Sequence, residues 1–265
     1  MQNICNIITP YYKIWKSGAV MKIFKRIVIT SLIFNIICIY LGGYGIYEKS
    51  DNSWSKGKEA AVFNEKEKTN PYYNDKVNSF KNIQESNEII FLGDSLTDYC
   101  NWNALFKNTN IENMGISGDN TEGVLNRIAE VYQLKPKKLF IMIGTNDLAC
   151  GKSKEHIISN YQNIIKYMKT NSNSTKIFVE SVLPINKEIL EKNGIARNEN
   201  NYDVEELDGK LKVMAAELEV KYLNLYDLFS KDNNLNEKYT VDGIHLNHEG
   251  YQVWKKAVEQ YVNTP

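Results

Sequence analysis

Short apolar runs recur along the chain from residue 89 onward, and each ends near a glycine or a polar loop. The clearest are Ile89–Leu92 and Leu139–Ile143, followed by the largely apolar Lys176–Leu183; Lys221–Leu225 is shorter, and Ile111–Met114 is the weakest. A run that is apolar on both faces is typical of a central parallel strand covered by helices on each side. We therefore predict a central parallel sheet of about five strands.

Helical periodicity fills the stretches around these runs. It predicts helices at 72–83, 121–133, 154–170, 203–219 and 247–261. In the last, Tyr251, Trp254, Val258 and Tyr261 recur at three- or four-residue steps and make one apolar stripe. Alternating strands and helices predict a three-layer α/β/α fold with right-handed crossovers. In such sheets, functional residues gather beyond the carboxyl ends of the strands.

A long uncharged segment precedes this pattern. Residues 27–47 hold 21 residues without one charge, about the length that an α-helix needs to cross a bilayer. Lys22, Lys25 and Arg26 come directly before it and Glu48 follows, which favours a cytoplasmic N-terminus and an outside body. We predict a single-pass membrane anchor, with a cleaved signal peptide and secretion as the alternative.

The remaining boundaries follow from this segment. Residues 1–26 are predicted to be cytoplasmic, and 1–20 resemble an upstream extension because Met21 opens an ordinary leader. Residues 48–69 are polar and charged, which predicts a solvated stalk, and 70–265 form the folded domain.

The formal net charge of zero hides an asymmetry. Residues 1–47 carry five bases and no acid, so the remainder has 27 bases against 32 acids. A mildly acidic body without a basic stripe argues against nucleic acid as a partner. The four cysteines show no zinc-ligand spacing, and no metal is predicted.

Four separated sequence islands hold the candidate chemistry. They are Gly93-Asp94-Ser95-Leu96, Ser117-Gly118-Asp119, Gly144-Thr145-Asn146-Asp147 and Asp242-Gly243-Ile244-His245. A serine hydroxyl is a weak nucleophile that needs an adjacent base, and His245 is a candidate for that base. Asp242 stands three residues earlier, at a spacing that can bring its carboxylate to the imidazole.

In this order the islands resemble the GDSL/SGNH hydrolase family, over roughly residue 70 to the C-terminus. The resemblance implies a flavodoxin-like fold and a serine esterase that works through an acyl-enzyme without a cofactor. It implies Ser95, Asp242 and His245 as catalytic residues. It also implies an oxyanion hole of the Ser95 and Gly118 backbone N–H groups and the Asn146 side-chain amide.

Each island also has a structural interpretation. Ser95 and Asn146 are of the residue types that cap helices, Gly118 is of a type common in turns, and His245 is open to a capping or surface role. We expect His156 to be solvated and His248 to begin the last helix. Asp94, Asp119 and Asp147 are predicted to brace their loops by hydrogen bonds.

The sequence says less about the substrate than about the fold or the catalytic residues. Residues 184–201 follow the fourth predicted strand and are rich in Asn, Lys, Glu and Arg, which predicts a polar rim. A polar rim favours a short acyl group on a carbohydrate or polysaccharide, with lysophospholipid as the runner-up. A non-catalytic carbohydrate-binding relative is a third alternative, and the oligomeric state stays open.

Cys100 and Cys150 each follow a candidate island by a few residues, Ser95 and Asn146 respectively. If the domain lies outside the cell, where disulfides persist, these thiols are candidates for a bridge across the rim of the site. Two unrelated thiols are the alternative, and the separation of the two residues decides between them.

Overall fold

A computed structural model describes residues 70–83, 88–108, 110–172 and 174–264. Its centre is a five-stranded parallel sheet in the order β2-β1-β3-β4-β5. The strands are β1 (Ile89–Gly93), β2 (Ile111–Gly115), β3 (Lys138–Met142), β4 (Lys176–Glu180) and β5 (Lys221–Leu223). This is the flavodoxin-like order, whose topological switch point lies between β1 and β3. The predicted α/β fold and all five strands are confirmed.

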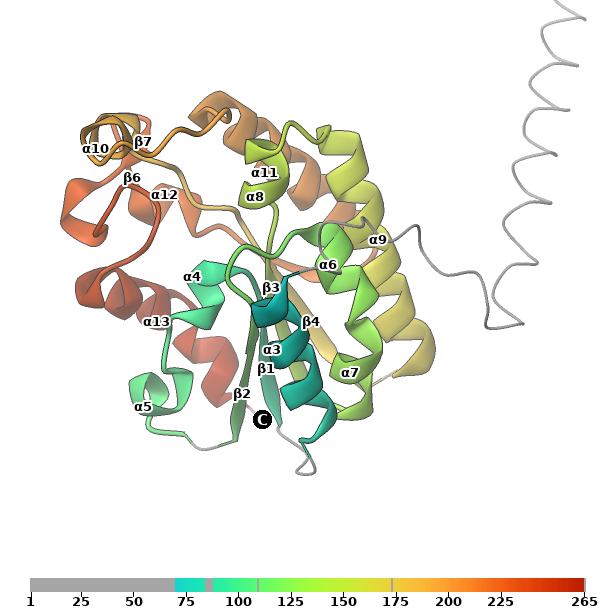
Figure 1. Cartoon of the computed structure of the whole chain (residues 1–265). Coiled ribbons are helices and arrows are strands. Elements are labelled where there is room, and N and C mark those ends of the chain that lie inside the picture. The colour runs from blue at the N-terminus through green and yellow to red at the C-terminus, as the bar shows by residue number, and fades with distance from the viewer. Residues whose placement is uncertain (1–69, 84–87, 109, 173, 265) are drawn as a thin grey trace, which may run out of the picture. The chain divides into compact units, whose positions relative to one another are not determined.

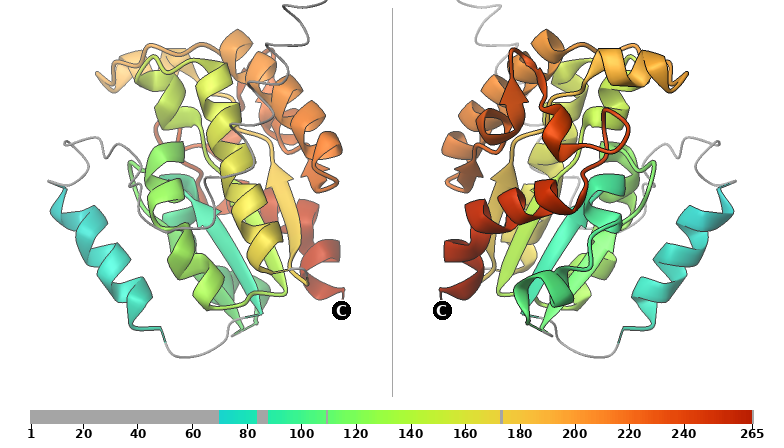
Figure 2. Two further views of the ribbon diagram at one scale, coloured as in Figure 1. Left: turned by 90° about the vertical axis from the view of Figure 1, so that its right-hand side faces the viewer. Right: turned by 90° about the vertical axis from the view of Figure 1, so that its left-hand side faces the viewer.

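Helices cover both faces of the sheet (Figure 1). Side chains of α3 (Pro71–Lys81), α6 (Thr121–Asn126), α7 (Ile128–Gln133), α9 (Lys154–Asn171) and α11 (Asn201–Glu217) pack into the larger apolar core on one face. The other face is covered by α5 (Trp102–Phe106), α12 (Tyr226–Phe229) and α13 (His248–Asn263). Figure 2 shows α9 in front of the sheet from one side and α13 with α5 from the other.

The two apolar cores form because successive side chains along each strand point to opposite faces of the sheet. Ile90 and Leu92 of β1 face the α9 side, whereas Ile89 and Phe91 face the α13 side, where Phe91 stacks on Trp102 with ring centroids 3.9 Å apart. Because a strand points successive side chains to opposite faces, a strand buried on both sides needs apolar residues at every position.

The structure refines several predicted boundaries. The helix predicted at 121–133 breaks at Arg127, whose side chain is fully buried rather than solvated. The stretch predicted as strand at 176–183 leaves the sheet after Glu180. A two-stranded hairpin of β6 (Ser230–Lys231) and β7 (Asn234–Leu235) was not predicted; Asp232 and Asn233 turn it with φ of 51° and 57°.

Further short elements lie near the carboxyl ends of the strands or in the connections. They are α4 (Ser95–Asp98), α8 (Thr145–Ala149), α10 (Lys187–Lys192) and the 3-10 helix at Glu237–Tyr239. The predicted anchor 27–47 and stalk 48–69 fall outside the described residues. Within the described ranges, no helix has both the length and the apolar character to cross a membrane.

Candidate active site

Ser95 is the first residue of α4, at the turn that follows β1. The turn is tight because Gly93 packs against its neighbours: a Cβ there would lie 2.3 Å from the Met142 carbonyl oxygen. Asp94 caps the helix by accepting a hydrogen bond from the Leu96 N–H at 3.0 Å. Ser95 is therefore not itself the cap, and its side chain stands at the carboxyl end of a central strand.

His245 reaches Ser95 from the other end of the chain. Its Nε2 lies 3.0 Å from the Ser95 Oγ, and its Nδ1 lies 2.6 Å from the Asp242 Oδ2. The structure thus connects the three predicted residues by a chain of two hydrogen bonds. In this arrangement the imidazole has the serine hydroxyl on one nitrogen and a carboxylate on the other.

Asp242 is held as a carboxylate by its surroundings. Its Oδ1 accepts the backbone N–H groups of Ile244 and His245 at 2.9 and 2.8 Å. Partial burial alone would raise the pKa of Asp242, but hydrogen bonds from the His245 ring and these two N–H groups outweigh it and keep the pKa below its ordinary value. The charge that orients the imidazole is therefore retained in mildly acidic solution.

The loop that carries Asp242 and His245 is closed by Thr240. The Thr240 hydroxyl donates to the His245 carbonyl at 2.8 Å and accepts the Gly243 N–H at 2.8 Å. Gly243 has φ of 99°, and a Cβ on it would lie 2.7 Å from the Asn186 carbonyl oxygen. Glycine therefore permits both the left-handed turn and the close packing of the 184–201 segment.

Gly118 and Asn146 meet in the adjoining loops. Asn146 is the second residue of α8, whose cap is Gly144, so the helix-cap interpretation of Asn146 is wrong. Its side-chain amide donates to the Asp119 carbonyl at 2.8 Å, directly after the exposed Gly118. The loop after β2 and the helix after β3 are thereby joined beside the turn that carries Ser95.

A buried arginine that sequence reasoning missed fixes these loops. The Arg127 guanidinium donates to the carbonyls of Met114 and Gly93 at 2.8 and 3.2 Å, and to the Asp119 Oδ2 at 2.7 Å. The Arg127 and Asp119 side chains are 0% and 1% exposed. The pair joins the ends of β1 and β2 to the Gly118 loop.

The three predicted loop braces are present as hydrogen bonds. Asp94 caps α4, Asp119 binds Arg127, and Asp147 accepts both the N–H and the hydroxyl of Thr121, at 3.0 and 2.6 Å. Burial raises the pKa of Asp94 to about 7 and that of Asp147 to about 6.

The other two histidines contact residues other than Ser95. His156 is only partly solvated, because its Nε2 lies 2.9 Å from the Glu122 carboxylate. His248 is the first residue of α13, as predicted.

Residues 184–201 border the site on two sides. Asn186 donates its N–H to the Gly243 carbonyl at 2.8 Å. Arg197 donates to the Thr145 carbonyl at 3.0 Å, and Asn198 donates to the Ala149 carbonyl at 3.0 Å. The segment therefore touches both the His245 loop, through the apolar cluster of Ile185, Leu190 and Ile244, and the helix that carries Asn146, through polar side chains.

The disulfide between Cys100 and Cys150 is not formed, and both cysteines are free thiols. Cys100 is 6% exposed and packs in the apolar core on the α13 side, whereas Cys150 is exposed at the end of α8. Burial raises the pKa of the Cys100 thiol to about 12. One side chain thus faces the core and the other faces solvent.

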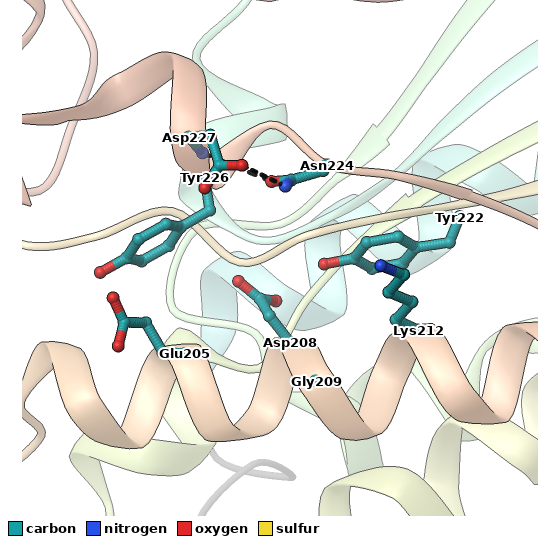
Figure 3. A pocket seen from close by; sticks show the side chains of 8 residues that line it. All are labelled: Glu205, Asp208, Gly209, Lys212, Tyr222, Asn224, Tyr226 and Asp227. Carbon is teal, nitrogen blue, oxygen red and sulfur yellow. Dashed lines mark hydrogen bonds between the residues drawn. The ribbon is translucent and has the colours of Figure 1, made fainter.

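A separate polar pocket of about 250 Å³ lies between α11 and the segment after β5 (Figure 3). Asp208 points from α11 between Tyr222 and Tyr226, and its Oδ1 accepts the Val182 N–H at 2.8 Å. None of Ser95, Asp242 and His245 lines it. Burial raises the pKa of Asp208 to about 8. Its carboxyl group holds the chain as it leaves β4.

Glu180 is another buried acid with a raised pKa. It is 1% exposed at the end of β4, and its Oε1 accepts the Trp254 indole N–H at 2.8 Å. Burial raises its pKa to about 8. Because the folded state binds this proton more tightly than the unfolded chain, the stability that the proton contributes is complete below about pH 4.5 and is lost as the pH rises through 8.

Glu180→Gln should therefore flatten the stability profile between about pH 4.5 and pH 8. The amide still offers an oxygen to Trp254 but cannot ionise. We expect the free energy of unfolding of the native protein to fall between pH 5 and 9 by on the order of a few kcal/mol more than that of the variant. Urea titrations across this range measure it, and parallel profiles would contradict the assignment.

The chain matches the GDSL-like Lipase/Acylhydrolase family over residues 91–253. It belongs to this family. The match begins within β1 and ends within α13, so it covers Ser95, Asp242 and His245 together. The description of this family is that of lipases and acylhydrolases.

Two curated relatives match part of the chain. The chain is 30% identical over 195 residues to an N-acylneuraminate cytidylyltransferase of Escherichia coli, covering 71% of this chain and 43% of that protein. It is 31% identical over 103 residues to the platelet-activating factor acetylhydrolase IB subunit alpha2 of Gallus gallus, covering 37% of this chain and 44% of that protein. The chain thus spans less than half the length of these curated relatives.

A solved GDSL-like lipase from Bacteroides thetaiotaomicron has the same fold. It superposes with a TM-score of 0.62 at 23% identity, covering 72% of this chain and 96% of that chain. This likeness concerns the arrangement of sheet and helices.

Proposed function

We propose that the protein hydrolyses short-chain carboxylic esters, acetyl esters of carbohydrates above all, through a covalent acyl-enzyme on Ser95. The observation that carries the proposal is the chain of hydrogen bonds through His245. Its Nε2 lies 3.0 Å from the Ser95 Oγ, and its Nδ1 lies 2.6 Å from the Asp242 Oδ2. A protein that only binds carbohydrate has no need of a serine activated in this way.

The proposed reaction has two halves. Ser95 Oγ attacks the ester carbonyl while its proton passes to His245 Nε2, and Asp242 stabilises the imidazolium. The tetrahedral intermediate collapses as His245 gives that proton to the leaving alcohol, which leaves the acyl group on Ser95. A water then attacks the acyl-enzyme with His245 as base, and the acid and the free serine are released.

Three donors are proposed for the oxyanion. Ser95 is the first residue of α4, where backbone N–H groups have no partner within the helix. Gly118 is an exposed residue that has a backbone N–H to offer, and the Asn146 amide carries two hydrogens. One of these binds the Asp119 carbonyl, which orients the group and leaves the other for the substrate.

Asn146→Ala should lower kcat by about 10²–10³, because an oxyanion donor acts mainly in the transition state. KM for p-nitrophenyl acetate should change little. Steady-state kinetics measure both constants, with Asn198→Ala as the control, because Asn198 also donates to α8 but at its far end. Equal effects of the two variants would contradict the proposal for Asn146.

The short acyl chain is supported by the polar segment 184–201 against the site. The acetylhydrolase named among the relatives also acts on an acetyl group, as its name states. A panel of p-nitrophenyl esters from acetate to palmitate tests the preference. Turnover that peaks at long chains would favour a lysophospholipase or lipase type of acylhydrolase instead. From the sequence we also propose that residues 27–47 anchor the enzyme in the membrane with this domain outside the cell.

A further inference from the structure

An exposed tyrosine stands beside the candidate base. Tyr99 directly follows α4 and is 56% exposed, although it is a large aromatic residue in the middle of the site. Its ring centroid lies 5.1 Å from that of His245, with the two planes inclined by 46°. Its hydroxyl lies 2.8 Å from the Ser117 Oγ, next to Gly118.

Tyr99 is held at both ends. Its backbone N–H donates to the Ser95 carbonyl at 3.1 Å, and its hydroxyl is paired with Ser117. Ser117 is itself fixed, because its N–H donates to the Asp98 Oδ2 at 2.9 Å. An exposed ring that is already immobilised loses little conformational entropy when a ligand covers it. The Tyr99 ring is therefore already held in a position where a ligand can pack on it.

The position of the ring indicates which part of an ester would cover it. In the proposed reaction His245 Nε2 donates a proton to the leaving alcohol, so the alcohol lies against His245. The acyl carbonyl instead lies toward the oxyanion donors. The Tyr99 ring lies beside His245, where the leaving alcohol would be, while its hydroxyl end reaches Ser117 beside Gly118. An alcohol bound at His245 would therefore be within reach of the exposed ring.

We infer that Tyr99 is a specificity-determining residue whose ring stacks against the pyranose ring of the alcohol in a sugar ester. This inference rests on the proposed esterase function and names the part of the substrate that Tyr99 recognises. A pyranose presents a face of C–H groups that packs on an aromatic ring, while its hydroxyls stay at the edge and remain hydrated. An acyclic alcohol has no such face.

The test compares two acetates of primary alcohols that differ in the ring. They are methyl 6-O-acetyl-glucopyranoside and 2-methoxyethyl acetate. Tyr99→Leu keeps an apolar side chain and removes the flat face. We expect KM for the sugar ester to rise about 10-fold with kcat within about twofold, and kcat/KM for the acyclic ester to change less than about twofold.

Tyr99→Phe is the matched variant, because it keeps the ring and removes only the hydroxyl paired with Ser117. It should retain most of the discrimination between the two esters. If Tyr99→Leu lowers kcat for both esters equally and shifts the acid limb of the pH profile, Tyr99 acts by positioning His245, and the inference is wrong.

Failure of the inference and failure of the proposed function give different results. A native enzyme that hydrolyses the acyclic ester through Ser95 but shows no preference for the sugar ester overturns only the proposed role of Tyr99. A protein that hydrolyses neither ester, or one whose activity survives Ser95→Ala, overturns the proposed function itself.

Discussion

Ser95→Ala should abolish ester hydrolysis, lowering kcat by about 10³–10⁶. The variant removes the Ser95 Oγ, which lies 3.0 Å from His245 Nε2 and is the atom that would carry the acyl group. His245→Ala should cause a loss of similar size, because the serine and its base act as a unit and neither is effective alone. The hydrolysis of p-nitrophenyl acetate measures both variants.

The matched control is His248→Ala. His248 lies three residues past His245, begins α13, and contacts Gln252 rather than Ser95. It should retain nearly native kcat. A large loss in His248→Ala with normal activity in His245→Ala would show that the base has been assigned to the wrong histidine.

Covalent labelling distinguishes chemistry from binding. A fluorophosphonate should label the native protein at Ser95, because the probe reacts with an activated serine. Ser95→Ala should be unlabelled while its unfolding midpoint stays close to native, since a small side chain that is 6% exposed is shortened without leaving a buried charge. Absence of labelling in the native protein would favour the non-catalytic relative.

The sheet was predictable because its strands are buried on both faces. Ile89–Gly93 and Lys138–Met142 are buried at every position, and apart from Lys138 and Gly93 their residues are apolar, so both strands can be recognised as apolar runs in the sequence. The site was predictable for a related reason: Asp242 and His245 are three residues apart on one loop, and Ser95 and Asn146 directly follow two neighbouring strands.

The contacts that depend on long-range packing were not predictable. Arg127 lies in a stretch with helical periodicity, where an arginine usually faces solvent. Its burial is explained by its partners in the folded chain, which are the Asp119 carboxylate and the carbonyls of Gly93 and Met114. Cys100 and Cys150 follow neighbouring islands, but spacing along the chain does not say which way a side chain faces. Tyr99 gave no signal because its partners, His245 and Ser117, come from distant segments.

Arg127→Met should destabilise the fold by about 3–5 kcal/mol, the range found when one partner of a buried ion pair is removed. The methionine fills much of the volume, but the Asp119 carboxylate would stay buried without its counter-charge. The carbonyls of Gly93 and Met114 would also lose their donor. Urea unfolding followed by circular dichroism measures the change in the free energy of unfolding.

The double variant Arg127→Met/Asp119→Asn separates the charge from the packing. Asparagine removes the uncompensated charge and keeps an oxygen for the Asn120 N–H, which the Asp119 Oδ1 accepts at 3.0 Å. We expect it to recover about 1–3 kcal/mol of the loss. Esterase activity should stay low in both variants, because the Asp119 carbonyl positions Asn146 and the guanidinium ties this loop to Gly93, the last residue of the strand before Ser95. A single variant within about 1 kcal/mol of the native protein would show that the arginine does not stabilise the fold.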